Sequence, residues 1–557
     1  MFPSLRALTW SVVLACGSTP IVAQWEYEWA FQSIGGGDNN ASVCRFAPDG
    51  SILLAGGYSG DTPIEIGGIT WYSPLHPSAP GYIAKLDPTG IALWAHFIQE
   101  QGPVPTFNAP FAIATDSAGN VFIGGNYTDS LLWDGNMILT DTTNDPDNAA
   151  RSMYVVKMDP AGDPLWSIGM SVGHFMLGDL VVNDAGDIIL AGASTTTPDE
   201  AGRLMKLSGA DGAVLFDHIA SSPDVVVQNL GLDSAGNIFA QGWNPTPFTL
   251  GGGPVCPYNN VLGSNEPSIF AGKFDPMGVA LWYHVPDQGT APNFSNFFGY
   301  ARFTVGRNGS SRTVTGKAVR FGADTIADGQ GALNGVYALD PDGALQWHRT
   351  MNTTGAILVG DVERDHEDLL IAGAIMNGPV DIGDTVITTS PNGVDVLLLR
   401  LDGAGELNGL LAGPYLCAAV ATPYPVDGLA IDDDGLPAIC GTFVGTEPVF
   451  GPDTLSGAWQ SFLARVGPLS IPTGGIEEPR PRISLFPNPT DRSITVDLGL
   501  AREANAVVYD ASGSEVWSRT ISSSSLRLDV STWPNGIYHI RMVGQVGPTS
   551  ARFVVAH

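Results

Sequence analysis

Acidic side chains are the residues of this chain that could do chemistry, since 56 Asp and Glu outnumber 25 Lys and Arg. Two carboxylates that meet in one cavity can hydrolyse a glycosidic bond, and a larger set can bind Ca²⁺. The run Asp432-Asp433-Asp434-Gly435 has the composition of a calcium loop, but it lacks the D-x-D-x-DG spacing and the downstream bidentate Glu. The sequence requires no cofactor, and weak Ca²⁺ binding at this run stays open.

The motifs of the common catalytic classes are missing from the sequence. It contains no G-x-S-x-G nucleophile elbow, no HExxH zinc motif, no Walker loop and no dinucleotide fingerprint. The net charge of −31 argues against a nucleic-acid partner, because phosphate binding needs a basic surface. If the protein is an enzyme, two or more buried carboxylates with perturbed pKa values should converge in one pocket.

The cysteines give no metal motif. Cys16 lies near the N-terminus, and the remaining four permit three full disulfide pairings: Cys44, Cys256, Cys417 and Cys440. Cys417 and Cys440 flank one expected strand hairpin, so they are the expected pair in an oxidising compartment. Buried thiols on strands are the alternative.

A recurring phrase sets the architecture. The phrase consists of an apolar residue, Asp-x-x-Gly-Asn/Asp, an apolar run and a Gly. It recurs seven times, for example from Ile113, Val181 and Leu230. The acidic residue should cap a tight turn between two strands, and Gly should take positive φ there. We expect this turn role for a set of five aspartates: Asp49, Asp116, Asp184, Asp233 and Asp432.

A second phrase follows each copy of the first. It contains Asp-Pro-x-Gly or a degenerate form, a turn between two further strands, and it usually ends in an aromatic residue. The expected aromatic anchors of the outermost strands are Trp29, Trp94, Trp166, Phe216, Trp282 and Trp347. Because Trp29 precedes the first repeat and the last repeat lacks its outer strand, strand 25–34 should complete the last repeat.

Each repeat thus predicts four strands, the size of one propeller blade. The phrases resemble the bacterial β-propeller repeat (SBBP-type) over about residues 25–470. We expect an all-β protein: a seven-bladed β-propeller at 24–470, closed by strand 25–34, and a linker at 471–482.

Residues 483–557 differ from the body in charge and pattern. Residues 480–557 carry eight Arg and six acids, a net +2, which leaves −33 for the rest. Apolar residues alternate with polar ones around Ile494 and Ile537, as in the half-buried strands of a small Ig-like β-sandwich.

Four motifs in order resemble the type A C-terminal sorting domain of type IX secretion cargo. They are Pro487-Asn488-Pro489, the turn with Asp510 and Gly513, Gly536-Ile537-Tyr538, and the segment starting at Arg552, where Lys is more usual. The resemblance implies that the secretion and sorting machinery is a partner. It also implies outer-membrane passage, removal of this domain, and release or surface attachment.

The N-terminus has the pattern of a signal peptide, residues 1–23, with Arg6 as its basic part and Leu8–Ala15 as its apolar core. The alternative is a lipoprotein acylated on Cys16. No later segment is long and apolar enough to cross a membrane. We expect an exported, surface or secreted monomer that binds a glycan or protein through its loops without catalysis. The alternative is a secreted hydrolase or lyase acting on polysaccharide or peptide, with carboxylates in the central funnel.

Overall fold

The chain forms two compact units, Met1–Leu469 (unit 1) and Ser470–His557 (unit 2). The computed structural model describes residues 23–35, 37–59, 63–71, 80–100, 110–127, 130–140, 152–170, 175–194, 201–259, 267–288, 301–316, 319–327, 333–353, 356–376, 379–382, 386–387, 393–417, 425–457, 459–468, 484–486, 490–497, 504–510, 514–521, 525–544 and 547–557. All secondary-structure elements in these residues are β-strands, which confirms the all-β expectation. A helix able to cross a membrane is not found among them. The predicted signal peptide lies outside them except for Ala23.

Three sheets of unit 1 contain four antiparallel strands in sequence order. The first comprises Ala112–Thr115 (β9), Val121–Tyr127 (β10), Ser152–Met158 (β13) and Pro164–Met170 (β14). The second comprises Phe175–Val182 (β15), Ile188–Ser194 (β16), Gly202–Leu207 (β17) and Val214–Ile219 (β18). The third comprises Val226–Leu232 (β19), Ile238–Asn244 (β20), Ser268–Phe274 (β21) and Ala280–His284 (β22).

Two sheets add a hairpin to the same four-strand order. One contains Asp38–Phe46 (β3), Ile52–Ser59 (β4), Gly81–Leu86 (β7) and Ala92–Glu100 (β8), with the hairpin Ser130–Trp133 (β11) and Asn136–Thr140 (β12). The other contains Ala301–Val305 (β24), Ser311–Thr315 (β25), Leu333–Leu339 (β28) and Leu345–Thr353 (β29), with Val380–Asp381 (β32) and Val386–Ile387 (β33). Short strands form three small sheets: Ile34–Gly35 (β2) with Ile64–Ile66 (β5) and Ile69–Trp71 (β6); Asp287–Gln288 (β23) with Val319–Phe321 (β26) and Asp324–Ala327 (β27); and Val449–Phe450 (β38) with Asp453–Thr454 (β39).

An eight-stranded sheet joins the two ends of unit 1. It runs Ala356–Asp365 (β30), Asp368–Met376 (β31), Val394–Leu401 (β34), Leu407–Cys417 (β35), Ala23–Gln32 (β1), Trp459–Pro468 (β40), Pro437–Val444 (β37) and Val426–Ile431 (β36). β1 pairs antiparallel with β40, from Trp25 opposite Pro468 to Gln32 opposite Phe462. It pairs with β35 over only two residues, in parallel. The first strand of the chain is thus the outer neighbour of the last strand of unit 1.

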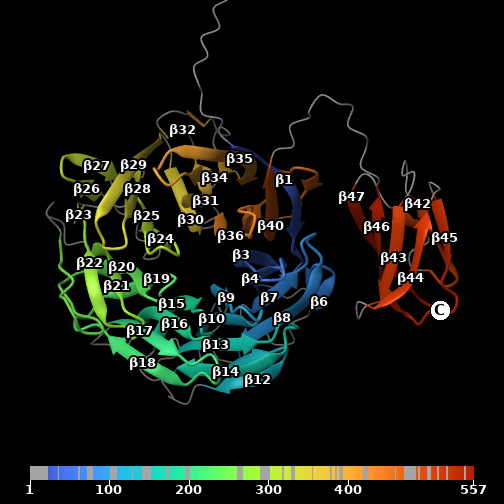
Figure 1. Cartoon of the computed structure of the whole chain (residues 1–557), viewed down its shortest axis with the longest axis horizontal. Coiled ribbons are helices and arrows are strands. Elements are labelled where there is room, and N and C mark those ends of the chain that lie inside the picture. The colour runs from blue at the N-terminus through green and yellow to red at the C-terminus, as the bar shows by residue number, and fades with distance from the viewer. Residues whose placement is uncertain are drawn as a thin grey trace, which may run out of the picture. The chain divides into compact units, whose positions relative to one another are not determined.

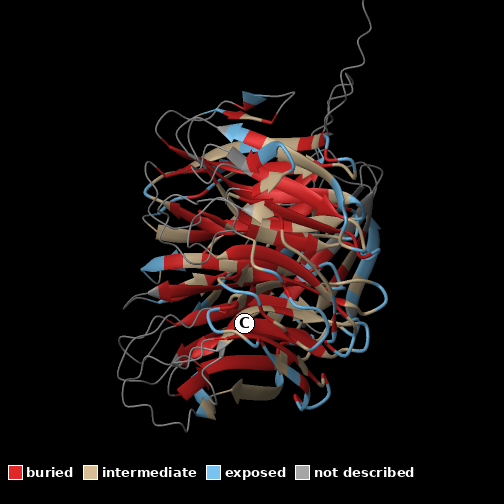
Figure 2. Cartoon of the chain, turned by 90° about the vertical axis from the view of Figure 1, so that its left-hand side faces the viewer, coloured by how far each residue is buried: buried red, intermediate tan, exposed pale blue. Residues whose placement is uncertain are grey.

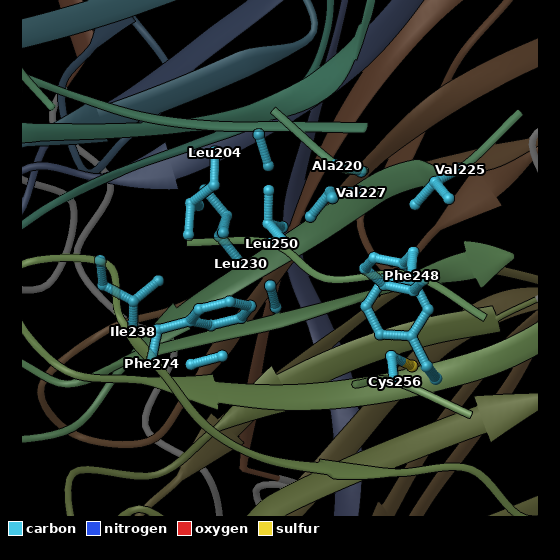
Figure 3. Close-up of a cluster of buried hydrophobic side chains, with 14 of the residues drawn as sticks. Leu204, Ala220, Val225, Val227, Leu230, Ile238, Phe248, Leu250, Cys256 and Phe274 are labelled. Carbon is cyan, nitrogen blue, oxygen red and sulfur yellow. The ribbon is translucent and has the colours of Figure 1, made fainter. Parts of the chain in front are cut away.

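The eight-stranded sheet holds two groups of four strands, β30-β31-β34-β35 and β36-β37-β40-β1, and the first strands of successive groups contact one another (Figure 1). Contacts run from β3 to β9, β15, β19, β24, β30 and β36 in chain order, and β36 also contacts β3. The hydrophobic core of unit 1 consists of clusters between successive sheets. Figure 3 shows one of them, where Leu204 and Phe248 lie between the sheets of β15–β18 and β19–β22. Another joins Leu54 and Tyr82 of the β3 sheet to Ala438 and Leu463 of the last strands.

Strand interiors are buried and connecting turns are exposed (Figure 2), and the turns have the predicted chemistry at several positions. Asp116 accepts the N–H groups of Ala118 and Asn120 at 3.0 and 2.9 Å. Asp233 and Asp432 cap their own turns in the same way. Asp49 also lies in a turn, but two residues after the position that Asp116 takes in its own turn. There it accepts the Ser51 N–H, and its carboxylate binds Lys85 Nζ at 2.7 Å.

The prediction for Asp184 is wrong by one residue. Asn183 takes the capping position and accepts the N–H groups of Ala185 and Asp187 at 3.0 and 2.8 Å. The Asp184 side chain is exposed. Asn and Asp side chains both cap turns, so the dipeptide left two candidates, and the strand register of β15 and β16 selects the first.

The aromatic anchors lie on outer strands and contact the outer turn of the next sheet. Trp94 Nε1 donates to Pro160 O at 3.2 Å, and a Cβ on Gly162 would lie 2.9 Å from the indole. Gly162 has φ 93°, so this turn requires glycine for both space and conformation. Trp29 on β1 donates to Pro88 O at 3.0 Å and thereby joins the start of the chain to the β3 sheet. Three of the remaining anchors repeat this contact: the indole N–H groups of Trp166, Trp282 and Trp347 donate to the carbonyl oxygens of Gly209, Pro341 and Gly403, respectively. The last anchor, Phe216, stacks on His218 instead.

Unit 2 consists of two antiparallel sheets that share one core. Ser484–Phe486 (β41), Ser493–Asp497 (β42) and Ser525–Asp529 (β45) form one sheet. Ala504–Asp510 (β43), Glu515–Ile521 (β44), Gly536–Gly544 (β46) and Gly547–Val555 (β47) form the other. Residues from both sheets, including Ile494, Val508 and Phe553, make the buried cluster.

Candidate functional site

A cavity of about 1400 Å³ lies within unit 1, and we call it the inner cavity. The first strands of the sheets line it: β3, β9, β15, β19, β24, β30 and β36. Six of its charged side chains interact, and we call them the cavity cluster: Arg45, Asp179, Arg302, Asp361, Glu363 and Asp427.

Asp179 enters the cavity at a β-bulge in β15, where the register with β16 shifts between Leu177 and Asp179. Its carboxylate accepts the N–H of Leu180 at 2.7 Å and the N–H of Leu230 on β19 at 2.8 Å. Burial raises the pKa of Asp179 to about 6, against the opposite effect of these hydrogen bonds. The side chain therefore bridges two sheets and remains titratable near neutral pH.

Asp361 occupies the same place in β30, where the register shifts between Val359 and Asp361. Its carboxylate accepts the N–H of Val362 at 2.9 Å and the N–H of Leu429 on β36 at 3.1 Å. The preceding Gly360 has no room for a side chain, because a Cβ there would collide with the Val426 carbonyl. The sequence pair Gly-Asp thus marks a bulge that the next sheet approaches closely.

Arg45 on β3 forms the centre of the cluster. Its Nη1 lies 3.0 Å from Glu363 Oε1 and 3.5 Å from Asp361 Oδ2, and it donates to Leu429 O at 2.7 Å. Burial raises the pKa of Glu363, while the Arg45 guanidinium lowers it. Arg45 therefore links the first sheet to both ends of the eight-stranded sheet and partly neutralises the acids of β30.

Asp427 and Arg302 complete the cluster. Asp427 is the extra residue of the bulge in β36, between Val426 and Gly428. Burial raises the pKa of Asp427 well above its usual range, although Arg302 attracts the ionised form. Arg302 on β24 donates to Gly360 O. Four carboxylates thus face two guanidinium groups, and burial disfavours ionisation of three of the four.

The cluster can bind a cation or exchange protons. Its four acids exceed its two arginines, so an entering ammonium or guanidinium group would find uncompensated carboxylates. Asp179 and Asp361 already accept two backbone N–H groups each, which fixes their positions. Glu363 and Asp427 are the acids of the cluster best placed to bind something else.

Sequence reasoning did not identify any member of the cavity cluster. The signal was present as Gly-Asp in two repeats, Gly178-Asp179 and Gly360-Asp361, a few residues before the turn phrase. The sequence also offers three long inserts as loop binding sites, 71–80, 140–151 and 254–267, and they fall mostly outside the described residues. The acids Asp432–Asp434 form a repeat turn in which Asp432 binds Arg465, and the described residues contain no acid, His or Cys group suited to a metal ion.

The predicted disulfide between Cys417 and Cys440 is wrong. All four cysteines carry buried thiols. The two belong to different core clusters, since Cys417 packs with Val394 and Cys440 packs with Leu463. Sequence proximity around one hairpin is therefore a poor guide here, because the two side chains pack in different core clusters.

The sorting motif residues lie in unit 2 as far as they are described. Pro487, Asn488, Pro489 and Gly513 lie outside the described residues. Asp510 begins a turn and accepts the Ser514 N–H at 3.0 Å. The buried Tyr538 donates its hydroxyl to Pro534 O at 2.8 Å, and Gly536 pairs with Val555.

The last strand and the segment after the Pro-Asn-Pro motif meet. The Thr490 N–H donates to Val554 O, and the Ala556 N–H donates to Thr490 O, both at 2.9 Å. Arg552 is exposed on the same strand, paired in register with His539. Thr490, which follows the Pro-Asn-Pro motif, is thus joined to the last strand of unit 2 by two backbone hydrogen bonds.

One comparison with known proteins identifies the C-terminal region. Residues 484–556 match the model of the secretion system C-terminal sorting domain. No curated protein matches the chain.

Solved structures resemble the chain only weakly. A protein of unknown function from Dyadobacter fermentans has 9% identity and TM-score 0.36, covering 80% of this chain and 99% of its own. Prolyl oligopeptidase B from Galerina marginata has 8% identity and TM-score 0.34, and the match covers 72% of this chain and 46% of that enzyme's chain. The extracellular domain of a hybrid two-component system protein from B. thetaiotaomicron has 10% identity and TM-score 0.19, covering 96% and 99%. The sorting domain match is thus the informative comparison: the chain carries the C-terminal domain of type IX secretion cargo, which implies export, interaction with the secretion machinery, and a secreted or cell-surface location.

Proposed function

We propose that unit 1 is a seven-bladed β-propeller that type IX secretion delivers to the cell surface or the medium. Three observations support it: the recurring four-strand order, the contacts from β3 round to β36 and back to β3, and the core clusters between successive sheets. β1 beside β40 would close the ring and remove exposed sheet edges.

Processing follows from the same proposal. A signal peptide at 1–23 would be removed on export, and cleavage within the linker at 471–482 would release the propeller from the sorting domain at 483–557. Mass mapping of both termini of the secreted protein tests this. A mature chain from Gln24 to a residue of the linker is expected. A lipid on Cys16 with an intact C-terminus would contradict it.

The propeller binds a small cationic ligand in its inner cavity and does not convert it. The observation that carries this proposal is the cavity cluster, in which four half-buried carboxylates face two arginines and partial burial raises the pKa of Asp179, Glu363 and Asp427. A bound ammonium or guanidinium group would supply the missing positive charge and form charge-assisted hydrogen bonds. Binding rather than catalysis is favoured because Asp179 and Asp361 are held by backbone N–H groups.

Ligand-induced thermal stabilisation of the full chain tests the binding proposal. Putrescine and spermidine serve as cationic probes, with glucose as the neutral probe and succinate as the anionic one. The cations should raise the midpoint of the wild type, and Glu363→Gln should abolish that shift. Asp184→Asn, on an exposed turn outside the cavity lining, is the matched control and should respond like the wild type. Equal shifts with glucose, or none with any probe, would reject a cation site.

A secreted hydrolase or lyase is the second candidate. The observation in its favour is the pKa of about 6 for Asp179, because a carboxyl that stays partly protonated near neutral pH can act as a general acid. Incubation with polysaccharide and peptide mixtures, followed by mass spectrometry, separates the two. Unchanged mixtures agree with binding alone. Products that disappear in the Glu363→Gln and Asp427→Asn variants would establish the enzyme.

A further inference from the structure

The first and last sheets of unit 1 meet at a pair of buried thiols. Cys44 lies on β3 and Cys440 on β37, and both side chains are fully buried in the cluster that joins these sheets. Neither cysteine lines the inner cavity. The pair is therefore independent of the cation site proposed above.

Several distances place the two side chains together. A Cβ on Gly428 would lie 2.6 Å from Cys440 Sγ and 3.0 Å from the backbone nitrogen of Cys44. Cys44 Sγ lies 3.7 Å from the carbonyl oxygen of Ala438, two residues before Cys440. Burial and the neighbouring Cys44 thiol both raise the pKa of the Cys440 thiol. Gly428 leaves the space between them open, since any side chain there would displace the Cys440 sulfur.

We propose that Cys44 and Cys440 form a disulfide bond in the exported protein and so lock the first sheet to the last. The bond would tie together the two ends of unit 1 at the place where β1 also joins them. Exported proteins fold in an oxidising compartment, where disulfides form and persist. A disulfide that closes so long a loop restricts the unfolded chain strongly.

The chemistry requires a disulfide-bearing oxidant, such as an oxidised thiol–disulfide oxidoreductase. The thiolate of one cysteine attacks the oxidant's disulfide, and a mixed disulfide forms as one oxidant thiolate leaves. The second cysteine loses its proton and attacks the mixed disulfide, which closes the Cys44–Cys440 bond. The oxidant leaves as a dithiol that has gained two electrons and two protons.

The bond must form before the sheets close. Both thiols are buried in the folded protein, and burial raises the pKa of Cys440 well above its usual range, so the folded dithiol is unreactive. Protein folded in a reducing compartment should therefore retain its thiols after purification in air. Exported protein should contain the disulfide.

Peptide mapping without reduction tests the proposal on the full chain, produced once with export to a bacterial periplasm and once in a reducing cytosol. After denaturation and alkylation, the exported protein should yield one linked pair of peptides containing Cys44 and Cys440, with Cys256 and Cys417 alkylated. The cytosolic protein, which keeps its N-terminal segment, should yield five alkylated cysteines, Cys16 included. Four alkylated cysteines in the exported protein, or a link involving Cys256 or Cys417, would overturn the proposal.

Stability in reductant provides the second readout. Dithiothreitol should lower the unfolding midpoint of exported wild type by about 5 °C. It should leave exported Cys440→Ala unchanged. Cys256→Ala, which also removes a fully buried thiol, is the matched control and should keep the sensitivity to dithiothreitol. An equal response of all three proteins would also overturn the proposal.

Discussion

Two sets of carboxylates in unit 1 show opposite behaviour, and the difference separates structure from function. Turn acids such as Asp49 bind a cationic side chain and a nearby N–H group. Partial burial alone would raise the pKa of Asp49, but the Lys85 ammonium and the hydrogen bonds from Ser51 hold that pKa down at about 2. Cavity acids such as Asp427 are half-buried, and partial burial raises the pKa values of Asp179, Glu363 and Asp427. The turn acids lie in the repeated phrase, whereas Asp179, Asp361 and Asp427 lie at bulges that recur in the first strands, where the residue type varies between repeats. Regularity therefore identifies the residues that build the sheets, and departures from it identify the candidate site.

The largest effect should come from Asp361, which belongs to the cavity set but also holds the two end strands of the eight-stranded sheet, β30 and β36, together. Asp361→Ala removes the acceptor of the Val362 and Leu429 N–H groups and one partner of Arg45, so it should cost about 3 kcal/mol of unfolding free energy. Urea denaturation measures this. Asp361→Asn keeps one acceptor oxygen and should cost clearly less. Equal losses would show that charge rather than backbone bridging is its role.

Substitution of Asp427 should stabilise the protein rather than destabilise it. Because burial raises its folded-state pKa, the folded protein binds a proton that the unfolded chain has released, and stability falls as pH rises from about 4 towards the folded-state pKa. Asp427→Asn should therefore stabilise the protein by about 2 kcal/mol at pH 7 and have little effect near pH 4. Denaturation at the two pH values checks it, and a destabilised variant at pH 7 would contradict the burial argument.

Asp49 should give the opposite pH dependence. Its pKa is lowered to about 2, so the stabilisation it provides is present above its unfolded pKa near 4 and is lost as pH falls through 2. Asp49→Asn should cost about 1 kcal/mol at pH 7, because the carboxylate is partly exposed, and nothing near pH 2. If Asp49 and Asp427 variants changed stability in the same direction at pH 7, the distinction between the two sets would fail.

Asp184 should show the smallest effect. It is exposed, and its ion pair with Arg307 spans 3.9 Å, so Asp184→Ala should change the unfolding free energy by less than about 0.5 kcal/mol. Asn183→Ala, which removes the actual turn cap, should cost about 1 kcal/mol. Denaturation of the two neighbouring variants tests whether the strand register or the repeat phrase assigns the capping residue.

The sequence predicted the strand-rich fold and most of the turn caps because those features depend on local chemistry. Asp116 and Asp233 cap their turns through groups two and four residues away, and Trp94 recurs at a fixed place in its repeat. The cavity cluster depends on contacts between distant strands. Arg45 meets Glu363 across the cavity, and no local spacing indicates that contact. The Cys44–Cys440 contact escaped for the same reason, since it requires the first sheet to meet the last.

Calorimetric titration of the full chain with spermidine, in two buffers of different ionisation enthalpy, tests the cation site most directly. The cavity acids have raised pKa values, so a bound cation should draw them into the ionised form and release protons to the buffer. The account predicts saturable binding whose heat differs between the buffers, with the difference reduced in Glu363→Gln and Asp427→Asn. The account would be contradicted if no saturable heat were observed, or if both variants bound spermidine as strongly as the wild type does.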